Sequence, residues 1–286
     1  MMHKHFQHAS AFSRNLGWLT TEELVHLRGA DTAIAGLGGV GGSHLLTLAR
    51  LGIGRFRIAD FDRFELANFN RQVGATLSHL GRPKVDVLAE MALDINPELV
   101  LTRFGGGVNG DNLEAFLGGA DVYVDGLDFF ALPIRRQVFA ACAEMGIPAI
   151  TAAPIGWGAA LLVFVPGGTG FEDYFQLEGQ PEDEQLRRFL VGLSPELMQM
   201  GALMDPSRVD LERRTGPSTP VGCELCAALA ATTAVKLLLG RGDVRTAPAS
   251  LHIDAFSGEC RTIERPGGMQ HPAMQAALTE LRDGAE

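Results

Sequence analysis

The stretch TAIAGLGGVGGSHLLTLARLGIGRFRIADFDRFELANFNRQ, residues 32–72, decides the fold. An apolar run ends at Ala35, and the pattern G-x-G-x-x-G follows at once, at Gly36, Gly38 and Gly41. This order predicts a buried strand, a tight turn and a helix. Glycines permit such a turn and let a phosphate approach the backbone N–H groups at the start of the helix.

An acidic residue completes the pattern. A second strand is predicted for Phe56–Ala59, and Asp60 ends it at the spacing of the carboxylate that accepts hydrogen bonds from ribose hydroxyls. Gly39 in the turn and Asp62 beyond the strand belong to the same candidate nucleotide-binding set. The stretch therefore predicts a nucleotide site, and these features alone would also suit a nicotinamide dinucleotide.

The next hundred residues repeat the alternation of strand and helix, which predicts a Rossmann-like, doubly wound α/β fold with a mostly parallel sheet and helices on both faces. Val85, Leu88, Met91 and Ala92 recur at helical spacing after Gly81. The further elements expected are strands at Leu99–Phe104, Asp121–Asp125 and Ile147–Thr151, and helices at Asp111–Leu117 and Pro133–Met145.

The second half of the chain has a different character. We expect a hydrophobic strand at Trp157–Val165, a long crossover with an amphipathic helix, a buried helix at 223–239, a strand at Ser250–Ala255 and a short helix at Pro272–Leu281. The chain is interpreted as one domain, 1–286, with antiparallel additions in its C-terminal part. Its parts are an N-terminal arm and helix (1–30), a nucleotide-binding core (31–165), a partner-binding crossover (166–220) and a closing segment (221–286).

Charge and composition restrict the partners. The net charge of −10 disfavours nucleic acid and anionic membrane surfaces, and favours small molecules or proteins. Four cysteines and the absence of a recognisable signal segment predict a cytoplasmic protein. The apolar run Cys223–Leu239 is shorter than the roughly 20 residues of a membrane span and contains Glu224 and Lys236, so we expect a core helix and no membrane association.

A polar cluster after the second strand goes beyond what a redox dinucleotide requires. Asn68, Asn70, Arg71 and Gln72 lie within five positions, and Lys84 begins the next predicted helix. Arginine can bind phosphate oxygens in pairs, and lysine acts as a point charge. The cluster therefore indicates a triphosphate.

Two aspartates flank the carboxyl end of the fourth predicted strand. Asp125 and Asp128 lie at the carboxyl end of that strand, which is the edge where open α/β sheets bind ligands. Magnesium takes only one or two protein carboxylates together with phosphate oxygens. One of the pair would suffice for Mg²⁺, and a turn or helix cap is the alternative role.

Taken in order, five motifs resemble the ThiF/MoeB superfamily, whose adenylating domain is shared with ubiquitin-activating enzymes. The similarity covers roughly residues 10–165 and, more weakly, 220–256. The motifs are GLGGVGG, DFDRFELANFNRQ, the RPK of Arg82–Lys84, the DINPE of Asp94–Glu98 and the VDGLD of Val124–Asp128.

The resemblance implies a role for each matched residue. Asp60 would hold the ribose, Asn68 and Arg71 the phosphates, Lys84 the β- and γ-phosphates, and Asp128 the Mg²⁺. The implied reaction is attack by a carboxylate on the α-phosphate of ATP, which gives an acyl-adenylate and pyrophosphate. The carboxylate would be the C-terminus of a ubiquitin-like or sulfur-carrier protein, or of a peptide.

The resemblance also implies a homodimer. Arg14, in the segment FSRN, would reach the ATP phosphates of the neighbouring subunit. The match is thin there, because Ala11 stands where the family pattern has its first arginine.

The cysteines depart from the family pattern. The crossover 167–220 has no cysteine for a thioester, and the single C-x-x-C, Cys223 with Cys226, has no second pair to complete a zinc site. Zinc is therefore not expected. Cys223 could act as a nucleophile at a helix N-terminus, but a small buried residue is the favoured interpretation.

Three alternatives remain. The cluster NFNRQ also resembles tRNA threonylcarbamoyladenosine dehydratases, although the acidic charge disfavours a tRNA substrate. A nicotinamide-dependent oxidoreductase would explain Gly36 to Asp60 but leaves Arg71, Lys84 and Asp128 without a role. A non-catalytic binding subunit would keep the fold without needing these residues.

Overall fold

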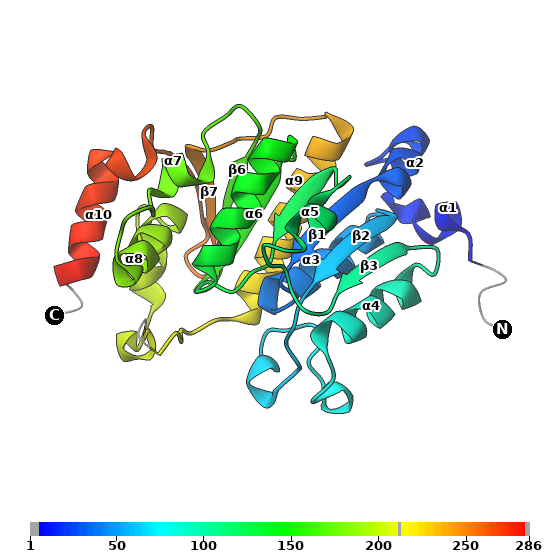
Figure 1. Cartoon of the computed structure of the whole chain (residues 1–286), viewed down its shortest axis with the longest axis horizontal. Helices are drawn as coiled ribbons and strands as arrows, with labels where there is room; N and C mark the ends of the chain where they lie inside the picture. Colours follow the sequence, from blue (N-terminus) through cyan, green and yellow to red (C-terminus); the bar gives the residue numbers. More distant parts are fainter. Residues whose placement is uncertain (1–5, 211–212, 284–286) are drawn as a thin grey trace.

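One sheet of eight strands runs through the part of the chain that the computed structural model describes, residues 6–210 and 213–283 (Figure 1). The strand order is β3-β2-β1-β4-β5-β6-β7-β8. The pairs among β3, β2, β1, β4 and β5 are parallel, and those that add β6, β7 and β8 are antiparallel. The strands are β1 (Asp31–Ala35), β2 (Arg55–Ala59), β3 (Val100–Phe104), β4 (Val122–Asp125), β5 (Ala149–Ile155), β6 (Gly158–Phe164), β7 (Ala249–Asp254) and β8 (Glu259–Glu264).

Helices cover both faces of the sheet, which confirms the predicted doubly wound fold. The first face is packed against α2, α3, α4 and α9, and the second against α5 to α8 and α10. In β1, Ile34 points to the first layer and Ala33 and Ala35 to the second, as strand alternation requires. The helices are α1 (His8–Ala11), α2 (Thr21–Gly29), α3 (Gly39–Arg50), α4 (Lys84–Ile95), α5 (Leu113–Leu117), α6 (Leu132–Met145), α7 (Phe171–Phe175), α8 (Glu182–Leu193), α9 (Pro220–Leu239) and α10 (Pro272–Asp283).

The main correction in the nucleotide-binding core concerns the start of α3. We expected the helix from Ser43, but it begins at Gly39, so most of the glycine motif is helical. Gly38 is the N-cap residue. The first turn of a helix carries free N–H groups, and the earlier start exposes those of the motif itself.

The apolar helix α9 is longer than predicted. It begins at Pro220 behind a Thr219 cap and has 20 residues, so it is long and apolar enough to cross a membrane by length and composition. In the structure it packs against α3, β5 and β6, and Cys226, Ala230 and Ala234 are buried in the core. We interpret it as a core helix.

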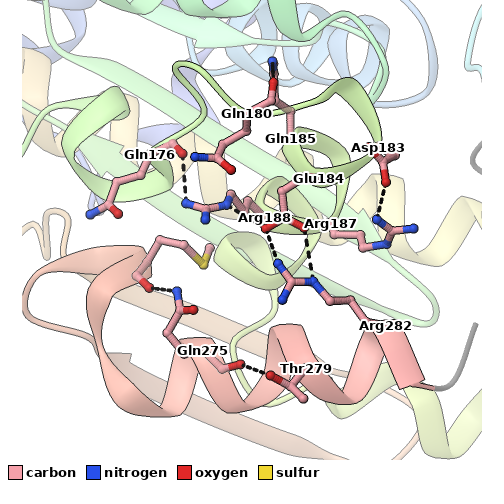
Figure 2. A network of polar contacts seen from close by, with 11 residues as sticks. Gln176, Gln180, Asp183, Glu184, Gln185, Arg187, Arg188, Gln275, Thr279 and Arg282 are labelled. Atoms are coloured by element: carbon pink, nitrogen blue, oxygen red, sulfur yellow. Dashed lines mark hydrogen bonds and ion pairs between the residues drawn. The ribbon is translucent and has the colours of Figure 1, made fainter.

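The crossover 166–220 contains two helices on the second face. The amphipathic helix was predicted and is α8, whereas α7 and the edge strand β8 were missed. Glu184 of α8 is buried and binds Arg188 at 2.9 Å and Arg282 of α10 at 2.6 Å, which joins the crossover to the C-terminal helix (Figure 2). Burial alone would raise the pKa of Glu184, but the bonds to Arg282 and Arg188 hold it below its ordinary value.

Candidate active site

The glycine turn is built from direct contacts between backbones. Gly36 has a φ of +80°, a conformation that favours glycine. A Cβ on Gly41 would lie 1.8 Å from Gly36 O, and one on Gly36 would lie 2.2 Å from Gly126 O. Sequence reasoning missed Gly126, which stands inside the VDGLD motif. Because Gly126 has no side chain, the end of β4 can approach the glycine turn.

Asp60 ties the turn to the second strand. Its side chain is buried, and Oδ2 accepts a hydrogen bond of 2.6 Å from Leu37 N, while Oδ1 accepts one of 2.7 Å from Asp62 N. A carboxylate offers about four lone-pair positions, so these two bonds leave acceptor capacity for ribose hydroxyls. The residue therefore shapes the turn as well as being placed for a ligand.

Arg71 and Gln72 lie against the first residues of α3. The aliphatic part of Arg71 comes within 3.6 Å of the position of a Cβ on Gly39, and its guanidinium donates to Ala67 O and Asn70 Oδ1. Gln72 is buried with its Nε2 beside Gly38, and its Oε1 has no hydrogen-bond partner among the described residues. This buried oxygen beside the turn therefore has an unused capacity to accept a hydrogen bond.

The two asparagines of the cluster hold the loop itself. Asn68 Oδ1 accepts from Glu65 N at 2.9 Å, closing a short helical turn. Asn70 Nδ2 donates to Ser218 O at 2.9 Å, which fastens the loop to the end of the crossover. Neither side chain needs a phosphate to account for its position.

Lys84 is a buried cation at the start of α4. Its ammonium is 2.9 Å from Asp62 Oδ2, and the Lys84 side chain is 7 % exposed against 52 % for Asp62. The Arg63↔Pro83 bridge draws the same two segments together. Asp62 and Lys84 thus place one positive charge beside the strand end that carries Asp60.

The structure gives the two aspartates at the carboxyl end of β4 different surroundings. Asp125 is buried, pairs with Arg135 Nε at 2.8 Å and accepts from Thr151 Oγ1 at 3.0 Å and Tyr123 OH at 3.1 Å. It therefore stabilises the fold. Asp128 is exposed and its Oδ1 accepts from Phe130 N at 3.0 Å. Of the two, only Asp128 faces solvent at this edge of the sheet.

Cys223 packs directly on the glycine turn. A Cβ on Gly39 would lie 3.0 Å from its Sγ, and the residue is 1 % exposed. Burial raises the pKa of the Cys223 thiol, against opposing contributions from Ser218 and Arg71. A raised pKa and burial agree with a core residue, so the contact with the turn reflects the packing of α9 on α3.

Arg14 is not brought to this site. The neighbouring Asn15 donates from Nδ2 to Arg50 O, at the last residue of α3, and Arg14 itself is exposed. The glycine turn is at the other end of that helix, whose 12 residues span about 18 Å.

His44 of α3 was not singled out from the sequence. It is fully buried, and neither ring nitrogen has a hydrogen-bond partner in the described ranges. Burial lowers the pKa of His44 to about 4, against the opposing charge of Asp125. The signal that could have found it is periodic: Val40 and Leu48, one turn away on either side, are apolar and place His44 on the buried face of the helix.

Fold and site together define a doubly wound α/β protein in which Arg71 lies against the glycine turn and the Lys84 ammonium lies beside the strand end that carries Asp60. The chain belongs to the ThiF family, because the model of that family matches residues 12–272.

The chain spans about half the length of the first curated relatives that it matches. It is 35 % identical over 137 residues to the sulfur carrier protein ThiS adenylyltransferase of Escherichia coli, covering 48 % of the chain and 54 % of the relative. It is also 35 % identical over 141 residues to the tRNA threonylcarbamoyladenosine dehydratase of Bacillus subtilis, 49 % and 55 %. The SAMP-activating enzyme E1 of Haloferax volcanii is 28 % identical over 217 residues, 76 % of the chain and 70 % of that protein.

Solved structures agree on the fold. PaaA superposes with a TM-score of 0.67 at 18 % identity, covering 92 % of the chain and 77 % of PaaA. Escherichia coli MccB crystallised with ATP gives 0.66 at 19 % identity, covering 89 % and 71 %.

Proposed function

We propose that this protein is an ATP-dependent adenylyltransferase that converts a carboxylate into an acyl-adenylate and releases pyrophosphate. The observation that carries the proposal is the buried Lys84 ammonium beside the Asp60 strand end, with Arg71 on the start of α3. A redox dinucleotide gives these two cations no function, whereas the phosphates of ATP would bind both. The family assignment supports the same choice.

The reaction needs charge and position more than proton transfer. One oxygen of the acceptor carboxylate attacks the α-phosphorus, the bond from that phosphorus to the bridging oxygen breaks, and pyrophosphate leaves with its charge. Arg71 and Lys84 stabilise the negative charge that grows on the phosphoryl oxygens, and the free N–H groups at the start of α3 add to this. The attacking carboxylate is already ionised at neutral pH, so no general base is required.

Asp128 fits the single-carboxylate environment that Mg²⁺ accepts. It is exposed at the carboxyl edge of β4, and no group of three or more potential metal-ligating side chains occurs among the described residues. Bound with the triphosphate, Mg²⁺ would neutralise phosphate charge. By binding the Mg²⁺, Asp128 would orient the positive charge of the metal toward the glycine turn.

We further propose that the acceptor is the C-terminal carboxylate of a sulfur-carrier or ubiquitin-like protein, or of a peptide, and that the enzyme is a homodimer. The name of the Escherichia coli relative supports the first point. The second rests on the resemblance of the segment that carries Arg14: about 18 Å of α3 separates Arg14 from the glycine turn of its own subunit, so the phosphate role that the resemblance implies would be in a neighbouring subunit.

The test is ATP–pyrophosphate exchange with carrier proteins that end in Gly-Gly. We expect acceptor-dependent exchange that is abolished by Asp128→Ala and reduced at least 100-fold by Arg71→Ala. Arg28→Ala is the control arginine, because Arg28 of α2 pairs with Glu98, away from the turn. Unchanged exchange in both site variants would refute the assignment, and failure to bind ATP would favour the non-catalytic alternative.

A second candidate is supported by the relative from Bacillus subtilis. A tRNA threonylcarbamoyladenosine dehydratase would use the same nucleotide site with a tRNA acceptor, and 35 % identity over 141 residues favours keeping it. The net charge of −10 argues against tRNA. Exchange stimulated by tRNA bearing that modification, and by none of the carriers, would establish this alternative.

A further inference from the structure

Two large aromatic side chains meet on the surface at the tips of neighbouring hairpins. Trp157 lies in the turn between β5 and β6, and Phe256 in the turn between β7 and β8. Their ring centroids are 5.9 Å apart with an angle of 30° between the planes. Trp157 is nevertheless 40 % exposed and Phe256 71 % exposed, so each ring leaves apolar surface open to solvent.

Both turns are held rigidly. Gly156 adopts a φ of +60°, and a Cβ on Gly158 would lie 2.2 Å from Ile253 O, so the two hairpins are in backbone contact. Asp254 is buried and its Oδ1 accepts from Phe256 N at 2.8 Å and from Ser257 N at 3.0 Å. A pair of rings fixed in this way loses little conformational entropy when it binds a ligand.

The pair lies at the reaction edge of the sheet. The ends of β5 and β7 point the same way as those of β1 and β4, since β6 is antiparallel to both of its neighbours. The loops of this edge, including the end of the crossover, gather on one side of the sheet in Figure 1.

A chain of contacts links the aromatic pair to the glycine turn. Thr219 Oγ1 donates to Gly156 O at 2.7 Å and caps α9, and Cys223, one helical turn further, packs against Gly39. Between Thr219 and Cys223 the helix rises about 6 Å, and with the contacts at each end the path is roughly 15 Å, which about five residues of extended peptide would span.

We propose that Trp157 and Phe256 bind an apolar side chain, preferably aromatic, of the acceptor polypeptide, about five residues before its terminal carboxylate. This inference rests on the proposed function and names the acceptor as an extended C-terminal segment. Such a segment is anionic at its end and can be apolar further back. The proposed reaction requires its carboxylate to reach the ATP phosphates at the glycine turn, and the aromatic pair lies beyond that turn at the same edge of the sheet.

The crossover extends the apolar surface. Gln199 packs against Gly156, and Met200 and Met204 of the same segment are 42 % and 92 % exposed. Methionine adapts to different apolar ligands, so the segment that carries Gln199 adds apolar surface next to the turn of Trp157.

Intrinsic fluorescence tests the proposal without requiring turnover. The chain has two tryptophans, so Trp18→Phe leaves Trp157 as the single reporter and serves as the parent. The probes are five heptapeptides ending in Gly-Gly: one with serine at its first five positions, and four in which a single phenylalanine replaces one of the first four serines. We expect one phenylalanine peptide to bind at least fivefold more tightly than the serine peptide, and Phe256→Ala in the same parent to abolish that preference.

Two results would overturn the inference: equal affinity for all five peptides, or a preference that survives Phe256→Ala. Exchange assays with the same peptides separate this inference from the proposed function. Preferential binding without any pyrophosphate exchange would sustain the aromatic site and reject adenylation. Exchange that is equally efficient with all five peptides would sustain adenylation and reject the aromatic site.

Discussion

Lys84 and Asp62 are joined twice: the Lys84 ammonium donates to Asp62 Oδ2 at 2.9 Å, and the Lys84 backbone N–H donates to Asp62 O at 2.9 Å. The first residue of α4 is thereby fixed to the loop that follows β2 and Asp60. A buried cation costs free energy unless it is paired, and here its partner is a half-exposed carboxylate. An incoming phosphate could take over that pairing at little cost.

The first prediction is that Lys84→Ala lowers kcat for ATP–pyrophosphate exchange by about 100-fold, because it removes a fixed charge beside the leaving phosphates. Asp62→Asn should change exchange by less than about fivefold, since Asp62 only holds the ammonium in the absence of a ligand. Steady-state exchange at saturating ATP measures both variants.

Arg82→Ala is the matched control for Lys84. Arg82 stands two positions earlier and binds Glu90 on the surface, so its loss should leave exchange within about twofold. If the Arg82 and Lys84 variants were equally active, the phosphate role of Lys84 would be wrong.

The second prediction concerns Gly41, whose Cβ would lie 1.8 Å from Gly36 O. Gly41→Ala should unfold the glycine turn or destabilise the protein by about 3 kcal/mol, because backbone cannot yield as a side chain can. Urea unfolding and ATP-dependent stabilisation measure the two effects. Gly29→Ala, with nothing within 4 Å of the new Cβ at the end of α2, should be neutral or slightly stabilising.

The third prediction separates the cysteines. Cys260 is exposed, whereas Cys142, Cys223 and Cys226 are buried, and burial raises the pKa of Cys142 to about 12 and also raises that of the other two. Iodoacetamide at pH 7.5 should therefore alkylate Cys260 alone in the native protein, as peptide mass spectrometry would show.

The same interpretation predicts that Cys223→Ala retains pyrophosphate exchange and that the native enzyme forms no thiol-sensitive adduct with an acceptor. Native alkylation of Cys223 at a rate close to that of Cys260 would contradict it. A variant that exchanges pyrophosphate but no longer transfers its acyl group would make Cys223 a nucleophile.

The parallel part of the sheet and the turn after β1 could be predicted because they depend on local sequence, whereas the phosphate roles of Arg71 and Lys84 stay predictions. The alternation of strands and helices fixed the order of elements, and the glycine motif with Asp60 placed the turn. Arg71 and Lys84 were recognised by charge and by their spacing from that motif. Physical spacing along one chain is enough where the site is built from a single βαβ unit and the helix after it.

Other features depend on contacts that are distant in sequence. Asp125 and Asp128 are chemically alike, and only the structure shows that Arg135, ten residues later, engages the first. Gly126 is required because three backbone segments meet at the turn. The stacking of Trp157 on Phe256 depends on the antiparallel order of β5 to β8, which periodicity alone did not determine.

The fourth prediction concerns pH and His44. Burial lowers the pKa of His44 to about 4 from an ordinary value of 6.5, so the unfolded chain binds a proton more readily than the folded one. Above pH 6.5 His44 is neutral in both states, and the free energy of unfolding has its full value. As the pH falls to about 4, the unfolded chain binds a proton at this histidine that the folded protein does not, which lowers the free energy of unfolding by about 3 kcal/mol in total. His44→Leu should reduce this acid sensitivity in urea unfolding followed from pH 7 to pH 4. His26→Ala, at an exposed position of α2, should leave the pH profile unchanged.

His252 contributes in the same direction, since burial also lowers its pKa to about 4, so part of the acid sensitivity should persist in the His44 variant. A pH profile identical to that of the parent would mean that His44 is protonated without cost, through water or a partner that reaches its ring.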